Sequence, residues 1–418
     1  MTQPHDPFPL AVSANRRYLV GANGQPFLIH GDTAWSIITA ITPDEAEQYL
    51  ANRAAKGINA IIVNLIEHKF NGPLTQAGEH PFTDPQDLST PNDKYFEYAD
   101  WVLKRAAYYG MAVFLCPMYL GYKHPADDDG WYREARHGGM NKCWKYGRYL
   151  GKRYAGYDNI VWMMGGDRNP DGAVDEVNSL LTGIKEFDKH ALFVAHAHPE
   201  DPTWEKYGWG GWLDLNSTYT YMIVHKKLLM DYNHKPVMPT FLMESSYEGE
   251  HNASPVQIRR QAYWAILCGA TGQFVGNNPI WLFNPGWKEA LESTGARDMV
   301  HLKAFFISRP WYNLIPDQKH EIITGGLGEY NGMDYLAAAA TADRKTLMAY
   351  LPSSRAITVD LGKLSGARLR GWWFNPRSGE SQPTGEFLPG VQQMLPPGEG
   401  DWGLVIDDKE LNLAPPEK

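Results

Sequence analysis

Two short apolar runs in this sequence each end abruptly in a single carboxylate. Residues 160–164 are followed by two glycines and Asp167, and residues 239–243 run directly into Glu244. A run of this kind predicts a buried strand whose last residue emerges at the edge of a sheet. Two such acids at one edge would form a carboxylate pair able to cleave a glycosidic bond. Asp167 and Glu244 are therefore the candidate catalytic residues.

The elements that must position these acids follow a regular alternation. Between about residues 27 and 306, short apolar runs alternate with longer amphipathic stretches. The predicted strands are residues 27–31, 60–65, 112–117, 160–164, 192–197, 215–219, 237–243 and 273–276. Helix-start signals lie between them, such as the Thr-Pro-Asp-Glu of residues 42–45. Eight strand–helix units predict an α/β fold, a (β/α)8 TIM barrel. A doubly wound open sheet is the alternative, but it rarely needs eight units, and no GxGxxG follows the first run.

The pattern changes after Pro310. Short strand candidates separated by Gly, Pro, Asn and Asp turns lie at residues 321–323, 335–340, 346–351, 356–360, 367–374 and 402–406. This spacing predicts a small all-β sandwich. We therefore expect two domains, a catalytic barrel over residues 1–310 and a β-sandwich over residues 311–418.

In a barrel, polar residues at the carboxyl ends of the strands form the site. The predicted substrate-binding residues at those ends are His30, Asp32, Trp35, Asn64, His198, Tyr219 and Asn277. Glu248 competes with Glu244 if the seventh strand is longer than expected. Aromatic residues make up 13% of the chain, which suits stacking against sugar rings. Tryptophans in or beside the predicted loops of the site are Trp35, Trp131, Trp204, Trp209, Trp212, Trp281 and Trp287.

Two other interpretations remain open. His30, Asp32, His196 and His198 could instead hold the metal ion of a metal-dependent hydrolase on a barrel. The commoner use of such residues is hydrogen bonding to hydroxyl groups, so we expect no metal and no cofactor. The third interpretation is a carbohydrate-binding barrel without catalysis.

Charge and hydropathy restrict the class of partner. The formal net charge is -9, with no basic run, which argues against a nucleic-acid partner. No apolar stretch is long enough to span a membrane, so we expect no membrane partner. Residues 1–10 contain no secretory signal as written, which predicts a cytoplasmic protein, or a periplasmic or secreted one if a signal was removed. The expected partner is an oligosaccharide or glycoside substrate, and nothing in the sequence indicates an oligomeric state.

Several segments resemble the apiosidase-like glycoside hydrolases, a bacterial family. The matching segments are residues 26–35, 59–64, 162–167 and 244–248, and residues 371–380 resemble the β-sandwich that follows such barrels. The resemblance implies a barrel of the retaining-glycosidase superfamily, with Asp167 as general acid/base and Glu244 as nucleophile. It also implies action on a plant cell-wall sugar, apiose in pectin side chains. We expect the enzyme to be exo-acting. The broader superfamily usually has Asn then Glu at the end of the fourth strand, where this chain has Gly166 and Asp167.

Overall fold

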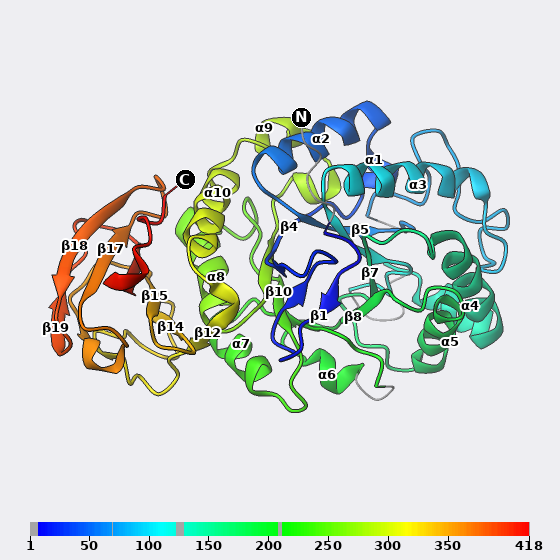
Figure 1. The fold of residues 1–418 in the computed structure, drawn as a ribbon. Coiled ribbons are helices and arrows are strands. Elements are labelled where there is room, and N and C mark those ends of the chain that lie inside the picture. Colours follow the sequence, from blue (N-terminus) through cyan, green and yellow to red (C-terminus); the bar gives the residue numbers. More distant parts are fainter. Residues whose placement is uncertain (1–6, 69, 123–128, 208–210, 418) are drawn as a thin grey trace.

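The larger part of the chain is a barrel of eight parallel strands, the fold predicted from the sequence (Figure 1). The structure is a computed structural model that describes residues 7–68, 70–122, 129–207 and 211–417. The barrel strands are β4 (Ile29–Thr33), β5 (Ala60–Asn64), β6 (Ala112–Cys116), β7 (Ile160–Gly165), β8 (Leu192–His196), β9 (Asn216–Tyr219), β10 (Thr240–Glu244) and β11 (Gly272–Val275). They lie in the order β8-β7-β6-β5-β4-β11-β10-β9. Ser217 Oγ of β9 donates to Ala195 O of β8 (2.5 Å), and Asp214 N, just before β9, donates to Phe193 O of β8 (2.9 Å), which closes the ring.

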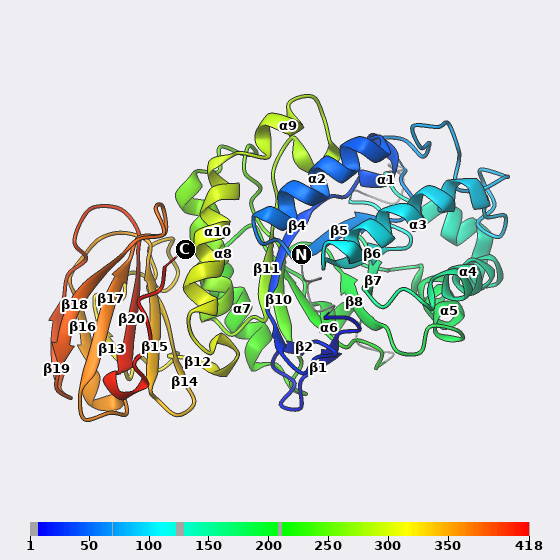
Figure 2. The ribbon, with the colours of Figure 1, turned by 45° about the horizontal axis from the view of Figure 1, so that its top comes forward.

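Helices surround the strands (Figures 1 and 2). They are α1 (Ile37–Ala40), α2 (Pro43–Ala55), α3 (Asp93–Tyr108), α4 (Tyr132–Tyr154), α5 (Val174–Lys185), α6 (Thr203–Lys206), α7 (Val224–Asn233), α8 (Pro255–Leu267), α9 (Trp287–Ala290) and α10 (Thr294–Ile307). The signal at residues 42–45 starts α2, since Thr42 and Glu45 form a capping box there. No helix in the described ranges is both long enough and apolar enough to cross a bilayer.

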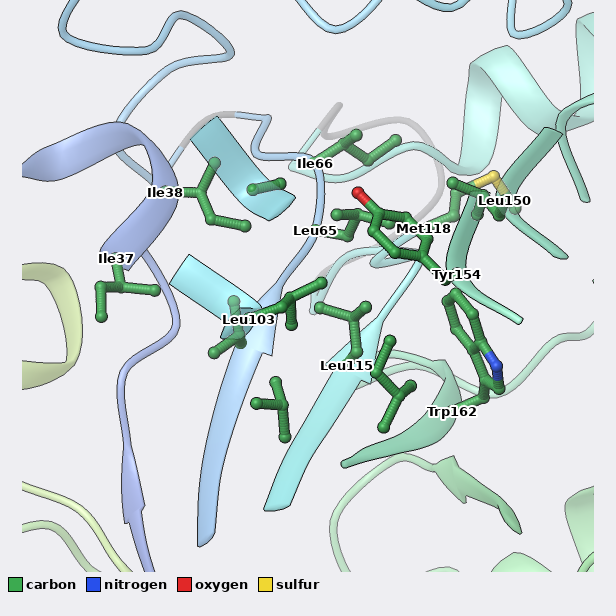
Figure 3. Packing of buried hydrophobic residues seen from close by; sticks show 14 of the residues in the cluster. Ile37, Ile38, Leu65, Ile66, Leu103, Leu115, Met118, Leu150, Tyr154 and Trp162 are labelled. Atoms are coloured by element: carbon green, nitrogen blue, oxygen red, sulfur yellow. The ribbon is translucent and has the colours of Figure 1, made fainter. Parts of the chain in front are cut away.

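Side chains on each barrel strand alternate between two hydrophobic cores, because successive residues of a strand point to opposite faces. On β6, Val113 and Leu115 pack against the helices, whereas Phe114 and Cys116 fill the barrel interior. Figure 3 shows the outer core, in which Leu115 packs among side chains of the surrounding helices. The strand ends therefore have a defined inward face, and only residues on it can contribute to a central site.

A small sheet that the sequence analysis did not predict lies at the amino end of the barrel. It consists of β1 (Ala11–Val12), β2 (Leu19–Val20) and β3 (Pro26–Phe27). Phe8, Leu10, Leu19 and Phe27 pack into the same core as the inward-facing barrel residues. These side chains fill the barrel interior at its amino end.

The C-terminal part is the predicted β-sandwich, a separate unit beside the barrel in Figure 2. One sheet is ordered β12-β14-β15-β20-β17-β18 and contains β12 (Leu314–Pro316), β14 (Ala337–Thr341), β15 (Thr346–Leu351), β17 (Leu369–Phe374), β18 (Ser381–Phe387) and β20 (Trp402–Asp408). The other sheet contains β13 (Ile323–Gly325), β16 (Ile357–Asp360) and β19 (Val391–Met394). The connection between α10 and β12 spans residues 308–313, and we propose the domain boundary there, at residue 310.

The sandwich packs against α8, the helix that follows β10. Arg259 of α8 donates from Nε and Nη2 to the Asp401 carboxylate (2.7 and 2.8 Å) and from Nη1 to Asp298 Oδ2 (2.7 Å). All three residues are buried, and such pairs stabilise a structure only when their geometry is good. The stacked rings of Tyr263 and Tyr350, 4.5 Å apart, extend this contact. The barrel and sandwich therefore hold the β10–α8 segment from both sides.

Candidate active site

Asp167 and Glu244 lie at the carboxyl ends of their strands and face one another. Glu244 is the last residue of β10, and Asp167 follows β7 by two positions. Gly165 turns the chain with a φ of 102°, and a Cβ there would meet His196 O at 2.3 Å, so only glycine permits this turn. One oxygen of each carboxylate and one ring nitrogen of His196 lie within 4.8 Å of one another. The two acids predicted from the sequence are thus brought together.

His196, the last residue of β8, lies between the two acids. Its Nε2 is 3.1 Å from Asp167 Oδ1 and 3.3 Å from Glu244 Oε2, and its Nδ1 is 3.2 Å from Ala197 O. Burial opposes a charge on this ring, but Asp167 and Glu244 outweigh it and raise the pKa of His196 above its ordinary value. The imidazolium form satisfies all three contacts, because both ring nitrogens then donate.

Two tyrosine hydroxyls connect the carboxylates in a chain. Tyr219 Oη lies 3.0 Å from Asp167 Oδ2 and 2.9 Å from Tyr221 Oη, and Tyr221 donates to Glu244 Oε1 at 3.1 Å. Three contacts need three hydrogens, but two hydroxyl groups supply only two. A proton on either carboxyl group completes the chain, because the two hydroxyl groups can donate in either direction along it. The chain therefore favours one proton shared between the two acids.

The electrostatic environment of Asp167 favours Asp167 as the acid that holds this proton. Only 22% of its side chain is exposed, and burial, followed by the charge of Glu244, raises the pKa of Asp167 to about 6, against the opposing effects of His196 and the tyrosines. A carboxyl group with such a pKa still holds a proton in part near neutral pH, as a general acid requires.

The tyrosine chain makes a testable prediction for Tyr221→Phe. This change removes the donor to Glu244 and leaves Tyr219 free to donate to an ionised Asp167. We expect kcat/KM to fall by about 10- to 100-fold, the worth of a hydrogen bond to a charged group. We also expect the alkaline limb of the pH–rate profile to move to lower pH, because ionised Asp167 gains a donor. An alkaline limb at the wild-type position would show that the chain has no influence on Asp167.

A cavity of about 530 Å³ opens beside the two acids. This volume lies in the usual range for small-molecule sites. Its aromatic lining consists of Trp35, Phe70, Tyr119, Tyr122, Tyr221, Tyr247 and Trp281. Its other lining residues are Asp167, Glu244, Glu250, His251 and Leu282. Of the tryptophans predicted near the site, Trp35 and Trp281 line the cavity, Trp131, Trp204, Trp212 and Trp287 do not, and Trp209 lies outside the described residues.

Two of the predicted substrate-binding residues belong to this site. Trp35 lines the cavity, and its Nε1 donates to Tyr247 Oη at 3.2 Å. Tyr219 is buried behind the cavity wall, where it contacts Asp167. Trp35 therefore faces the cavity, whereas Tyr219 contacts the carboxyl group of Asp167.

His30 and Asp32 face the helices instead of the cavity. The apolar pattern predicts that the first strand ends at residue 31, but β4 continues to Thr33, so both residues lie within the strand. Ile29 belongs to the interior core, and the alternation turns His30 and Asp32 outward. Asp32 pairs with Arg53 and accepts a hydrogen bond from Tyr49 Oη (2.9 Å), both residues of α2. We therefore assign Asp32 to holding α2 on the barrel, and not to binding substrate.

Three other predicted residues also lie away from the cavity lining. Asn64 donates to Glu67 Oε1 at 3.2 Å, and Asn277 donates to Glu248 Oε2 at 2.9 Å. His198 is exposed, with Nδ1 2.9 Å from Pro199 O. All three residues lie at or just after the ends of barrel strands, as predicted. Their polar groups, however, contact other protein groups or face solvent, and they do not line the cavity.

The four residues of the metal interpretation do not converge. His196 faces the barrel interior, whereas His30 and Asp32 face outward and His198 lies in the loop after β8. The described residues that could hold a metal ion are instead Asp167, His196 and Glu244. Those three are the same groups that form the carboxylate pair and its histidine bridge.

Several lining residues are not among the predicted site residues. Tyr247, Glu250 and His251 lie in the loop after β10, and Tyr221 follows β9. A weak signal for Tyr221 was present, because it stands two positions after Tyr219 and so continues the same face. Tyr247 and Glu250 are four and seven residues past the predicted strand end at residue 243, where sequence alone gives no direction for a side chain.

Comparison with protein families gives matches over both parts of the chain. A model described as "Apiosidase-like, catalytic domain" matches residues 13–313. A model described as "Putative collagen-binding domain of a collagenase" matches residues 315–407. A comparison with curated proteins found no significant match.

Solved structures of glycoside hydrolases are similar over nearly the whole chain. One described as a glycoside hydrolase is 26% identical, with 97% of this chain and 98% of that chain covered and a TM-score of 0.85. A glycoside hydrolase family 5 structure from Bacteroides vulgatus is 25% identical, with coverages of 96% and 94% and a TM-score of 0.85. A β-mannanase from the blue mussel Mytilus edulis, 14% identical with a TM-score of 0.50, covers 71% of this chain and 97% of its own, and shares the fold alone.

Proposed function

Because the chain belongs to the apiosidase-like family of glycoside hydrolases, we propose that it is a retaining exo-glycosidase with Glu244 as nucleophile and Asp167 as general acid/base. In the first step, Glu244 attacks the anomeric carbon while Asp167 protonates the leaving oxygen. In the second step, the ionised Asp167 deprotonates a water molecule, and the water releases the sugar from Glu244.

The short separation of the two acids carries the proposal of retention. An oxygen of Asp167 and an oxygen of Glu244 lie within 4.8 Å of one another. Retaining enzymes place their carboxyl groups about 5–5.5 Å apart, whereas inverting enzymes need about 6.5–9.5 Å to admit a water molecule. The spacing therefore supports direct attack by a carboxylate.

The two roles are divided by the hydrogen-bonding environment of each acid. Glu244 accepts a hydrogen bond from Tyr221 and contacts the His196 ring, so two neighbouring groups hold its carboxylate in place. Asp167 has a pKa raised to about 6 and completes the tyrosine chain when protonated. An anionic nucleophile opposite a protonated acid is the starting state of the retaining mechanism.

The proposed substrate is a terminal sugar of a plant cell-wall or related oligosaccharide, such as apiose in pectin. The aromatic walls of the cavity suit the apolar faces of a sugar ring. The amino end of the barrel interior is filled by side chains. A chain end entering from one side fits this arrangement, which supports exo-action.

The stereochemistry of the product tests the mechanism. We would screen chromogenic glycosides and pectic oligosaccharides, and follow the best substrate by proton NMR from the first seconds of the reaction. The expected first product is the sugar with the anomeric configuration of the substrate, with mutarotation following later. Release of the opposite anomer first would reject Glu244 as a nucleophile.

A further inference from the structure

A carboxylate in the loop after β8, Glu200, holds the residues around Tyr221. Thr220 Oγ1 lies 2.8 and 2.7 Å from its two oxygens. Its Oε1 also accepts hydrogen bonds from Tyr221 N at 2.9 Å and from Met222 N at 3.3 Å. Among the described residues, no lysine, arginine or histidine pairs with Glu200. Its side-chain contacts therefore all go to one short segment, residues 220–222, which we call the Tyr221 segment.

The Tyr221 segment lies outside the regular elements that flank it. β9 ends just before the segment, and α7 begins two residues after it. Thr220 N donates to Glu244 O at 3.2 Å, which fixes the start of the segment. The next two N–H groups along the chain turn to the Glu200 carboxylate. Glu200 therefore supplies the acceptors that this part of the backbone would find in a ladder.

The side chain of Tyr221 receives little support from packing. It is 44% exposed, and its ring meets Tyr219 edge-on, with centroids 5.3 Å apart. Its hydroxyl must nevertheless reach both Tyr219 Oη at 2.9 Å and Glu244 Oε1 at 3.1 Å. Hydrogen bonds weaken quickly with distance and angle, so the place of this hydroxyl depends on the backbone that carries it.

Glu200 itself has an unusual backbone conformation. Its φ of 71° lies in the left-handed region, which residues other than glycine rarely adopt. Its N–H donates to Tyr219 O at 3.0 Å, so the main chain and the side chain of Glu200 both hold the end of β9. A residue keeps such a conformation only where its surroundings impose it, and residues of this kind cluster at functional sites.

The loop after β8 also contacts the loop after β7, which carries the proposed acid. Asn169 accepts from His198 N at Oδ1 (3.2 Å) and donates from Nδ2 to Asp201 Oδ2 (2.6 Å). Residues 198–201 thus touch the loop of the acid on one side and the Tyr221 segment on the other. This placement lets one loop set the position of both ends of the tyrosine chain.

We propose that Glu200 is a positioning residue, which places the Tyr221 hydroxyl for its hydrogen bonds to Tyr219 and Glu244. This inference rests on the proposed function, since the tyrosine chain joins the proposed catalytic pair. Glu200 is not among the described residues that line the cavity, so it acts through Tyr221 and not on the substrate.

A double-mutant cycle tests this role, because two residues that act through one hydrogen bond give losses that do not add. Glycine adopts a φ of 71° freely, so Glu200→Gly removes the carboxylate without straining the backbone. Glu200→Gly should lower kcat/KM by about 10-fold, and by no more than Tyr221→Phe does. Added to Tyr221→Phe, it should cause a further loss of less than about twofold, because the hydroxyl that it places is already absent.

The titration of Asp167 supplies a readout that needs no turnover. Aspartate labelled at the side-chain carboxyl carbon would be followed by NMR, and Asp167→Asn would identify the signal. Glu200→Gly and Tyr221→Phe should each lower the midpoint, because Tyr219 then donates to the ionised acid. The other titratable groups that act on Asp167 are unchanged in both variants, and these are Glu244, His196 and Tyr119.

Glu200→Gln separates placement from charge. It removes the same charge as Glu200→Gly but keeps an oxygen that can accept from Tyr221 N, so kcat/KM and the Asp167 midpoint should lie close to the wild type. Glu205→Ala removes an exposed carboxylate on α6 and should alter neither quantity. Circular dichroism checks that each variant folds, and Glu200→Ala repeats the cycle if the glycine variant does not.

Three results would overturn the inference. The losses of Glu200→Gly and Tyr221→Phe could multiply in the double variant, Glu200→Gly could leave the Asp167 midpoint unmoved, or Glu200→Gln could move it as far as Glu200→Gly does. The proposed function fails separately, through undiminished turnover by Glu244→Gln, and the NMR titration still reports on Glu200 in that case.

Discussion

Glu244→Gln is expected to lower kcat/KM by about 10⁴-fold or more, because it removes the atom that forms the covalent intermediate. Glutamine has nearly the same shape and can still accept a hydrogen bond from Tyr221. We therefore expect a folded protein whose thermal unfolding midpoint lies within a few degrees of the wild type. The measurement is steady-state hydrolysis of the best chromogenic glycoside, with circular dichroism to check folding.

Chemical rescue distinguishes a lost nucleophile from a lost acid. In Glu244→Ala, azide can occupy the space of the missing carboxylate and attack the anomeric carbon of an activated glycoside. The expected product is a glycosyl azide of inverted configuration. A glycosyl azide of retained configuration would show instead that Glu244 is the acid/base. As a control, Glu97→Gln removes an exposed carboxylate on α3 and should leave the kinetics unaltered.

The main architecture could be predicted from the sequence because it depends on repeated patterns. Eight apolar runs separated by amphipathic stretches indicated the barrel, and the segments at residues 26–35 and 162–167 indicated the family that the match over residues 13–313 confirms. β18 was missed because it contains Pro383 and Gly385 and lies at the edge of its sheet, where few apolar side chains are needed.

The candidate site was predictable only where a residue type had a single reasonable orientation. A carboxylate directly after a buried strand, such as Glu244, must face the strand ends or a partner. The direction of the Asp32 side chain depends on whether Asp32 lies within its strand. The predicted strand ends at residue 31, whereas β4 ends at Thr33 and therefore includes Asp32, whose side chain faces outward. Tyr219 could be selected because it ends a predicted strand, but nothing distinguishes Tyr247 among 23 tyrosines until the fold brings it to the cavity.

Asp167→Ala is expected to have an effect that depends on the leaving group. For an alkyl glycoside, whose leaving oxygen must be protonated, kcat/KM should fall by about 10²- to 10⁴-fold, the usual contribution of general acid catalysis. For a 2,4-dinitrophenyl glycoside the first step needs no acid, so kcat/KM should change little. Release of the sugar from Glu244 then becomes slow, because no base activates the water. A rapid burst of dinitrophenol should precede the steady state.

The pH dependence supplies an independent check on the same variant. The acid acts in its protonated form, so the wild-type kcat/KM for an alkyl glycoside should fall as pH rises through about 6, the raised pKa of Asp167. The alkaline limb should be absent in Asp167→Ala, because the group that titrates there is gone. Asp167→Asn offers a closer match in shape and should behave alike. An equal loss for alkyl and dinitrophenyl glycosides, with the alkaline limb intact, would assign proton donation to another residue, and His196 would then be the nearest group able to supply it.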